Sequence, residues 1–320
     1  MEKRNFIDSS FRVFSRYPKL ILPIFFSWII FFSVSIASLI FIKWDIRKIT
    51  DFIYPLFAYY IFFAFMISIA CSMLLEMIQQ IENGEPPSFF KSLWVTLNED
   101  LNDMIPVIFL WAILWAGITL IEIIISKREN YASRNRSYQT EELDDVRKAI
   151  ELINGNVEIG FSVFFFETLK RGIRMTAMMA FCAITWDNLG YYDSLKKAFR
   201  VIHSDFYEFA SGFLSTGLVL ILIFMPPIVA LWMQSNGIAH MQPRNYFFMG
   251  AYTLCALSYA IYMEQLFMGQ FYMWHKKWEK AAKKAIESGQ QPPEIAEIPH
   301  PSILDDTNDL KKDEQDNFPS

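Results

Sequence analysis

The chain has 320 residues, of which 53% are apolar and 31 are phenylalanine, and its mean hydropathy is positive. This composition is typical of an integral membrane protein and argues against two soluble domains. The formal net charge of -5 comes mainly from the last thirty residues and the loop after Gln79, and no basic face alternates with aromatic residues, so nucleic acid is excluded as an expected partner.

The first half of the chain contains three apolar stretches, each long enough to supply the roughly 20 residues that cross a bilayer. We predict transmembrane helices at residues 20–42, 52–78 and 104–126. The first follows a basic segment, lacks a signal-peptide cleavage site and should remain attached as a span. Before the third, a surface helix is expected at residues 88–102, with Ser88 as its N-cap and one apolar face formed by Phe90, Leu93, Leu97 and Leu101.

The second half begins with a polar insertion at residues 127–160, which is expected outside the cell. Further transmembrane helices are predicted at residues 161–186, 209–233 and 246–274, and the last should continue into the cytoplasm as a lysine-bearing helix. The membrane domain would then cover residues 1–286. The Pro-rich, acidic tail at residues 287–320 should be disordered.

An amphipathic stretch directly before the fifth predicted span indicates another surface helix, at residues 193–206. Its apolar residues recur at three- and four-residue intervals and continue into the span: Leu195, Phe199, Ile202, Phe206 and Phe209. Basic side chains lie between them: Lys196, Lys197, Arg200 and His203. A helix of this kind is expected to lie at the surface of a membrane.

Short sequence matches divide the chain into three similar units. Gly84, Ser88, Lys91, Leu93 and Val95 recur 106 residues later as Gly190, Ser194, Lys197, Phe199 and Val201. Residues 10–13 resemble both, which predicts a further surface helix at residues 6–16. The expected fold class is therefore an all-α integral membrane protein with six transmembrane helices, arranged as three repeats of an amphipathic surface helix plus two spans.

The distribution of basic residues predicts the orientation. The predicted cytoplasmic segments hold fourteen Lys and Arg residues, and the predicted external loops hold ten. Because cytoplasmic loops carry the excess of positive charge, both termini are expected in the cytoplasm.

The stretch from Asp187 to Phe206 carries a pattern shared by a group of bacterial membrane proteins. An apolar run ends in Asp187, Gly190 follows three residues later, and residues 194–201 read Ser-Leu-Lys-Lys-Ala-Phe-Arg-Val. The chain thus resembles uncharacterised six-span proteins related to the YciC-type inner-membrane proteins and to the membrane anchor domain of some glycerophosphodiester phosphodiesterases. The resemblance implies a bacterial inner-membrane protein without an assigned reaction. The charged fourth span and the missing phosphodiesterase domain depart from the pattern, so no catalytic residue is carried over.

No motif in the sequence points to a catalytic, cofactor or metal site. The sequences HExxH and GxSxG and a Gly-rich phosphate loop are absent, and the four histidines are too widely spaced to bind a metal together. Cys71, Cys182 and Cys255 each lie in an apolar stretch and are interpreted as small buried hydrophobic residues. We expect no cofactor and no enzyme activity; an intramembrane enzyme using buried ionisable groups is an alternative.

The candidate functional residues lie on the fourth predicted span. Only residues 175–186 are free of charge there, too few to cross a bilayer, so the helix must include Glu167, Lys170, Arg171 and Arg174. With a rise of about 1.5 Å per residue, Arg174 would lie roughly 18 Å from an inner boundary at Trp186. A lone arginine at such depth costs ~3 kcal/mol or more.

Two interpretations of this cluster remain open from the sequence. In one, residues 161–171 form an outer interfacial helix, the bilayer thins, and Glu167 and Arg171 form a surface pair. In the other, the charged residues form buried ion pairs or line a polar path for an anionic solute or lipid headgroup, with Glu122 and Glu264 as candidate counter-charges.

The leading functional hypothesis is a non-enzymatic membrane protein that organises or accompanies other membrane components, because three surface helices and a cytoplasmic tail offer surface for binding. The alternative is a small-solute or lipid transporter that uses the charged residues of the fourth span. The expected partners are the lipid bilayer and either a membrane protein or an anionic lipid.

Overall fold

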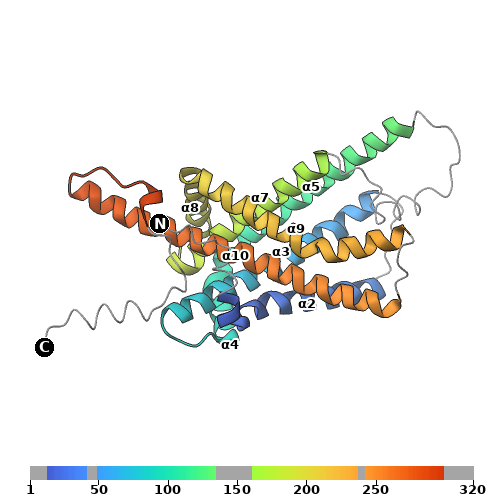
Figure 1. Ribbon diagram of the computed structural model, residues 1–320, viewed down its shortest axis with the longest axis horizontal. Coiled ribbons are helices and arrows are strands. Elements are labelled where there is room, and N and C mark those ends of the chain that lie inside the picture. Colours follow the sequence, from blue (N-terminus) through green and yellow to red (C-terminus); the bar gives the residue numbers. More distant parts are fainter. Residues whose placement is uncertain (1–12, 42–48, 135–160, 237–241, 299–320) are drawn as a thin grey trace.

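The computed structural model describes residues 13–41, 49–134, 161–236 and 242–298 (Figure 1). All regular secondary structure in these ranges is helical. The long helices are α2 (Leu22–Phe41), α3 (Ile49–Glu82), α5 (Leu101–Arg134), α7 (Phe161–Asp187), α9 (Phe206–Ser235) and α10 (Pro243–Glu287). The short elements are η1 (Pro18–Ile21), α4 (Phe89–Val95), the π-helical turn η2 (Thr96–Asp100), α8 (Tyr191–Ser204) and η3 (Ile295–Glu297).

Five stretches of the described residues are both long and apolar enough to cross a membrane. They are Pro18–Ser38, Phe57–Ile81, Phe89–Ile125, Phe206–Gln234 and Arg244–Glu287. The chain is therefore an all-helical protein of the multi-pass membrane type. Helix α7 is not among the five because four charged residues lie between positions 167 and 174.

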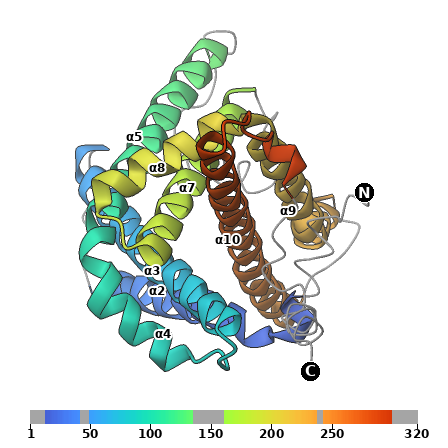
Figure 2. The ribbon, with the colours of Figure 1, turned by 90° about the vertical axis from the view of Figure 1, so that its left-hand side faces the viewer.

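Helix α7 lies at the centre of the bundle. It packs against α3, α5, α8 and α10 (Figure 2), and every residue from 177 to 185 is buried. Alanines at positions 177, 180 and 183 let the neighbouring helices approach closely, as small residues do between membrane helices. The three cations of α7 therefore meet carboxylates of neighbouring helices instead of lipid.

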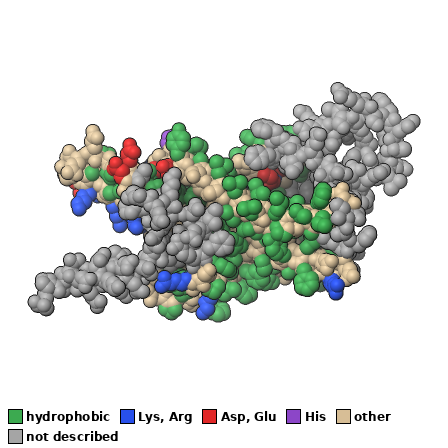
Figure 3. All heavy atoms as spheres, in the orientation of Figure 1, with side chains coloured by type: hydrophobic (Ala, Val, Ile, Leu, Met, Phe, Trp, Pro, Cys, Tyr) green, Lys and Arg blue, Asp and Glu red, His purple; other side chains and the backbone are tan. Residues whose placement is uncertain are grey.

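The helices around α7 present large apolar side chains to the outside. On α9 these include Leu214, Leu218, Ile221, Leu222 and Ile228, and on α2 they include Phe26, Ile30, Ile36 and Phe41. Figure 3 shows hydrophobic side chains over the middle of one face, with most of the described charged side chains towards its ends. An exposed apolar surface of this extent is expected where hydrocarbon replaces water.

The two surface helices bury small or polar side chains and expose large apolar ones. The buried residues of α4 and η2 are Ser92, Thr96 and Asp100, whereas Phe90 and Trp94 are 80% and 71% exposed. In α8, Ser194, Ala198 and Val201 are buried and Phe199 is 62% exposed. A helix on a soluble protein would bury its apolar face. The observed orientation is that of a helix lying in a membrane interface.

Local sequence explains how each surface helix begins. Gly84 has a φ of +78°, a left-handed conformation that ends α3, and Ser88 then caps α4 by accepting a hydrogen bond from the backbone N–H of Lys91. Before α8, Asn188 takes the left-handed conformation with a φ of +49°, and Gly190 is the N-cap. Both turns direct the chain sideways at the same end of the bundle (Figure 1).

Two expected helix boundaries are wrong. The break predicted between the surface helix at 88–102 and the third span is absent, because α4, η2 and α5 form one continuous helical run. The interfacial helix predicted as an alternative at 161–171 is also wrong, since α7 is a single unbroken helix of 27 residues. At about 1.5 Å per residue it is roughly 40 Å long, more than the ~30 Å hydrocarbon core.

The described part of the predicted tail contacts α10. Trp274 donates from Nε1 to the carbonyl of Ile298 at 3.0 Å, and Trp278 donates from Nε1 to the carbonyl of Pro293 at 2.8 Å. Residues 291–298 therefore pack back against α10, and their expected disorder is wrong. The rest of the predicted tail, most of the predicted helix at 6–16, and residues 135–160 of the predicted insertion lie outside the described residues.

Candidate functional site

Glu264 of α10 is the centre of an ion-pair cluster with two arginines of α7. Its side chain is 0% exposed. Arg171 donates from Nε to Oε1 at 2.8 Å, and Arg174 donates from Nε to Oε2 at 3.0 Å and from Nη2 to Oε1 at 2.9 Å. One carboxylate thus accepts charge-assisted hydrogen bonds from two guanidinium groups, an arrangement that is strong where water is excluded.

Helix α9 completes the surroundings of Arg171. The guanidinium donates from Nη2 to Thr216 Oγ1 at 2.5 Å, and its carbon lies 4.3 Å from the centroid of the Phe213 ring. A Cβ added at Gly217 would lie 2.5 Å from Nη1 of Arg171, so this position leaves room for the cation because it has no side chain. The cluster therefore joins α7, α9 and α10.

Lys170 forms a second cluster that joins α7 to α5. Its Nζ donates to Glu122 Oε2 at 2.6 Å and to Glu167 Oε1 at 2.7 Å. The lysine is buried, Glu122 of α5 is largely buried, and Glu167 is exposed. The surface pair expected between Glu167 and Arg171 is wrong, because each contacts a different partner.

The charges of the six candidate residues sum to zero. In their ordinary ionised states, the three cations Lys170, Arg171 and Arg174 carry as much charge as the three carboxylates Glu122, Glu167 and Glu264. A buried charge that loses its partner costs several kcal/mol, whereas a paired and hydrogen-bonded charge is tolerated. This balance explains how a helix with three cations lies at the centre of a membrane-type bundle.

An apolar groove of about 470 Å³ lies between α5, α7, α8 and α9. Buried residues such as Trp111 and Ala177 form its floor, and large exposed side chains form its rim: Leu114, Phe165, Leu169, Phe199 and Phe206. The hydroxyl of Thr176 in the lining donates to the carbonyl of Gly172 at 2.9 Å, so it is satisfied within α7. The volume falls in the roughly 300–1,000 Å³ range of ligand pockets, and the lining suits hydrocarbon.

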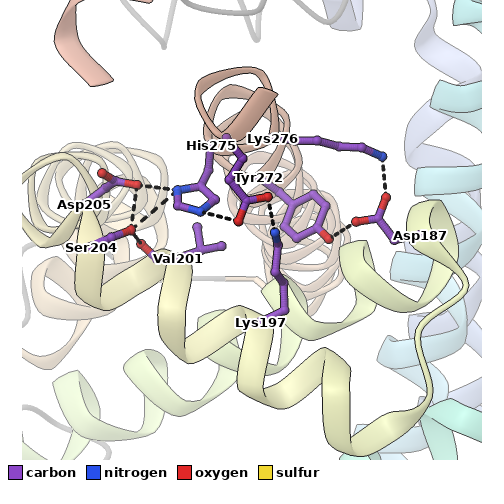
Figure 4. A network of polar contacts seen from close by, with 9 residues as sticks. Asp187, Lys197, Val201, Ser204, Asp205, Tyr272, His275 and Lys276 are labelled. Atoms are coloured by element: carbon purple, nitrogen blue, oxygen red, sulfur yellow. Dashed lines mark hydrogen bonds and ion pairs between the residues drawn. The ribbon is translucent and has the colours of Figure 1, made fainter. Parts of the chain in front are cut away.

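A polar network that joins α8 to α10 was not predicted from the sequence (Figure 4). The buried His275 of α10 lies with Nδ1 2.6 Å from Asp205 Oδ2 and with Nε2 3.3 Å from Glu279 Oε1. Glu279 also pairs with Lys197 of α8, and Ser204 donates to Asp205 at 3.0 Å. These contacts hold the middle and the C-terminal end of α8 against α10, although no local pattern marks residues seventy positions apart as partners.

Two further polar contacts stabilise the same end of the bundle. Asp187, at the end of α7, accepts hydrogen bonds from Tyr272 and Lys276 of α10 (Figure 4). Asp100 of η2 accepts hydrogen bonds from Ser72 of α3 at 2.8 Å and from Thr185 of α7 at 3.1 Å. Such satisfied buried groups fix one packing arrangement of helices.

The described part of the chain contains no group of three or more His, Cys, Asp or Glu side chains arranged to hold a metal ion. Cys71 and Cys182 are buried free thiols, and Cys255 is an exposed one. The interpretation of Cys255 as a buried residue is therefore wrong, because this part of α10 faces outward.

Comparison with protein-family models, with curated proteins and with solved structures finds no match to this chain. The resemblance suggested by the Asp187 to Val201 pattern thus stays a prediction.

Proposed function

We propose that this protein is a non-enzymatic bacterial inner-membrane protein that organises or accompanies other membrane components. It has six transmembrane helices, with α7 as the fourth, and both termini lie in the cytoplasm. The proposal rests on one observation above all: the three cations of α7 are paired with carboxylates inside the protein, while the apolar groove opens at the outer surface of the bundle.

The six-span arrangement is supported by α7 itself. Its length of 27 residues corresponds to roughly 40 Å, and its cations have carboxylate partners on α5 and α10. The order of elements supports three repeats, because α4 and α8 each precede a pair of long helices, α5 with α7 and α9 with α10. In this scheme α2 and α3 form the first pair.

The orientation is supported by the positions of basic residues. We call the end of the bundle where α4, α8 and the last part of α10 lie the α4/α8 end (Figure 1). It carries Lys91, three basic residues of α8 at positions 196, 197 and 200, and five lysines of α10 between positions 276 and 284. By the positive-inside rule this end belongs in the cytoplasm.

An organising role accounts for the site better than transport does. A polar path needs groups that can release one partner for a solute, whereas Glu264 is fully buried and holds both arginines. The cavity beside the cluster is apolar and offers no polar route. The groove and the outward-facing apolar residues of α4 and α8 instead favour association with lipid or with a helix of another membrane protein.

Purification of the full chain in a mild detergent, followed by identification of retained lipids and proteins, tests this function. We expect at least one lipid or protein to be retained in a stoichiometric amount. A protein that retains neither would contradict the proposal. So would a flux of solute or lipid across vesicles that is present with the parent chain and absent from protein-free vesicles, because that result would identify a transporter.

A further inference from the structure

We propose that the groove between α5, α7, α8 and α9 is a binding site for one anionic phospholipid, whose acyl chain lies in the groove and whose headgroup contacts Lys196 and Arg200 of α8. The inference rests on the proposed membrane role and names the component, the site and the residues that bind it.

The shape and lining of the groove fit an acyl chain. Its floor is formed by α5 and α7, and α9 forms its second wall through Phe209, Ala210 and Phe213. Nearly all of the lining side chains are apolar, and the exposed rim residues lie on helices whose outer faces are also apolar. A water-filled groove of this composition would be costly, whereas hydrocarbon fills it without loss of hydrogen bonds.

Helix α8 places cations at one end of the groove. It crosses the α4/α8 end of the bundle from the α5 side towards α9 (Figure 2) and contributes Leu195 and Phe199 to the lining. Lys196 and Arg200 follow these two residues directly, are exposed, and make no ion pair with any residue that the structure describes. Exposed Asp193 is the one acidic residue of α8, so the helix carries a net positive charge.

The polar network between α8 and α10 holds α8 in its position at the end of the groove. Lys197 pairs with Glu279 on the side of α8 that faces α10, and Asp205 holds the following turn against His275 (Figure 4). Lys196 and Arg200 take no part in these contacts and are exposed. Since a surface helix lies at the level of lipid headgroups, they meet a phosphate there while the chain below enters the groove.

Gly172→Leu is designed to fill the groove. A Cβ added at Gly172 meets no atom within 4 Å, so a larger side chain extends into the groove without a clash at its base. Gly117→Leu is the matched control, because an added Cβ there also meets nothing within 4 Å and Gly117 does not line the groove. Each variant is incorporated into vesicles that contain equal amounts of phosphatidylglycerol and phosphatidylcholine, and the phospholipid retained after extraction in mild detergent is measured.

We expect the parent and Gly117→Leu to retain about one phosphatidylglycerol per chain and Gly172→Leu to lose it. Equal retention by both variants would overturn the groove assignment.

A phosphatidylglycerol with a photoreactive acyl chain provides a second measurement on the unmodified protein. It should label Phe165, Leu169 or Phe206 in preference to the exposed residues of α2, and uniform labelling would likewise contradict the site.

The headgroup assignment is tested with Lys196→Gln combined with Arg200→Gln. Each cation contributes roughly a fivefold gain in affinity for an anionic surface, so the double variant should lower the affinity for phosphatidylglycerol by about 25-fold and reduce the amount retained. Lys280→Gln with Lys283→Gln removes the same charge from exposed positions of α10 and should change retention little. Equal retention of phosphatidylcholine by the parent, or equal losses in both double variants, would refute the selectivity.

The two proposals fail in different ways. Recovery of a stoichiometric protein partner without any bound phospholipid would leave the organising role standing and remove the lipid site. Recovery of neither would remove both.

Discussion

Replacing Glu264 by glutamine tests whether the central cluster holds the bundle together. The side chain keeps its size and one acceptor oxygen, but it loses the charge that two guanidinium groups share. Arg171 and Arg174 then have no carboxylate within the cluster. Removing one partner of a buried ion pair costs about 3 to 5 kcal/mol, because the remaining charge stays in a medium of low dielectric constant.

The second cluster supplies the internal comparison. In Glu122→Gln, Lys170 keeps Glu167 at 2.7 Å, so one carboxylate still balances the cation. The loss should not exceed that of one hydrogen bond to a charged group, about 1.5 to 3 kcal/mol. Arg174→Leu should also destabilise the protein less than Glu264→Gln does, since the carboxylate keeps Arg171 at 2.8 Å.

Thermal unfolding of the purified variants in detergent measures the difference. We expect the melting temperature to fall more for Glu264→Gln than for either Arg174→Leu or Glu122→Gln. Equal melting temperatures for Glu264→Gln and the parent would show that the ion-pair cluster is not desolvated and does not stabilise the bundle. An increase for Arg174→Leu would have the same meaning, because it would show that the arginine reaches an aqueous surface.

Two further predictions concern packing and orientation. Gly217→Ala should lower the melting temperature, because the new methyl group would lie 2.5 Å from Arg171 Nη1, whereas Gly117→Ala should raise it slightly through higher helix propensity; equal effects would contradict the close packing. For orientation, a cysteine at exposed Ser288 should react with a membrane-impermeant thiol reagent only after lysis, and one at exposed Asn236 should react in intact cells, in a background without the exposed native cysteine. The reverse pattern would place the α4/α8 end outside.

The surface helices show what periodicity can and cannot predict. The spacing of Leu195 and Phe199 correctly indicates an amphipathic helix, and α8 spans Tyr191–Ser204. The same pattern does not tell which side faces the bundle. Burial of Ser194 and Ala198 and exposure of Phe199 follow from the surrounding membrane, because hydrocarbon accepts the aromatic side chain and the bundle accepts the small ones.

The sequence by itself determined that the chain is helical and membrane-embedded, and that Arg171 and Arg174 need counter-charges, because helix length and the cost of burying a charge are local properties. Only the tertiary structure decided which carboxylate each cation binds. Glu264 lies 90 positions from Arg174, and Glu122 lies 48 positions from Lys170. The tertiary structure also decided three further features: the groove, the contact between His275 and Asp205, and the return of residues 291–298 to α10. They depend on how the helices rotate and cross when they pack. This packing is determined by side-chain volumes distributed over the whole bundle, which no local stretch of sequence specifies.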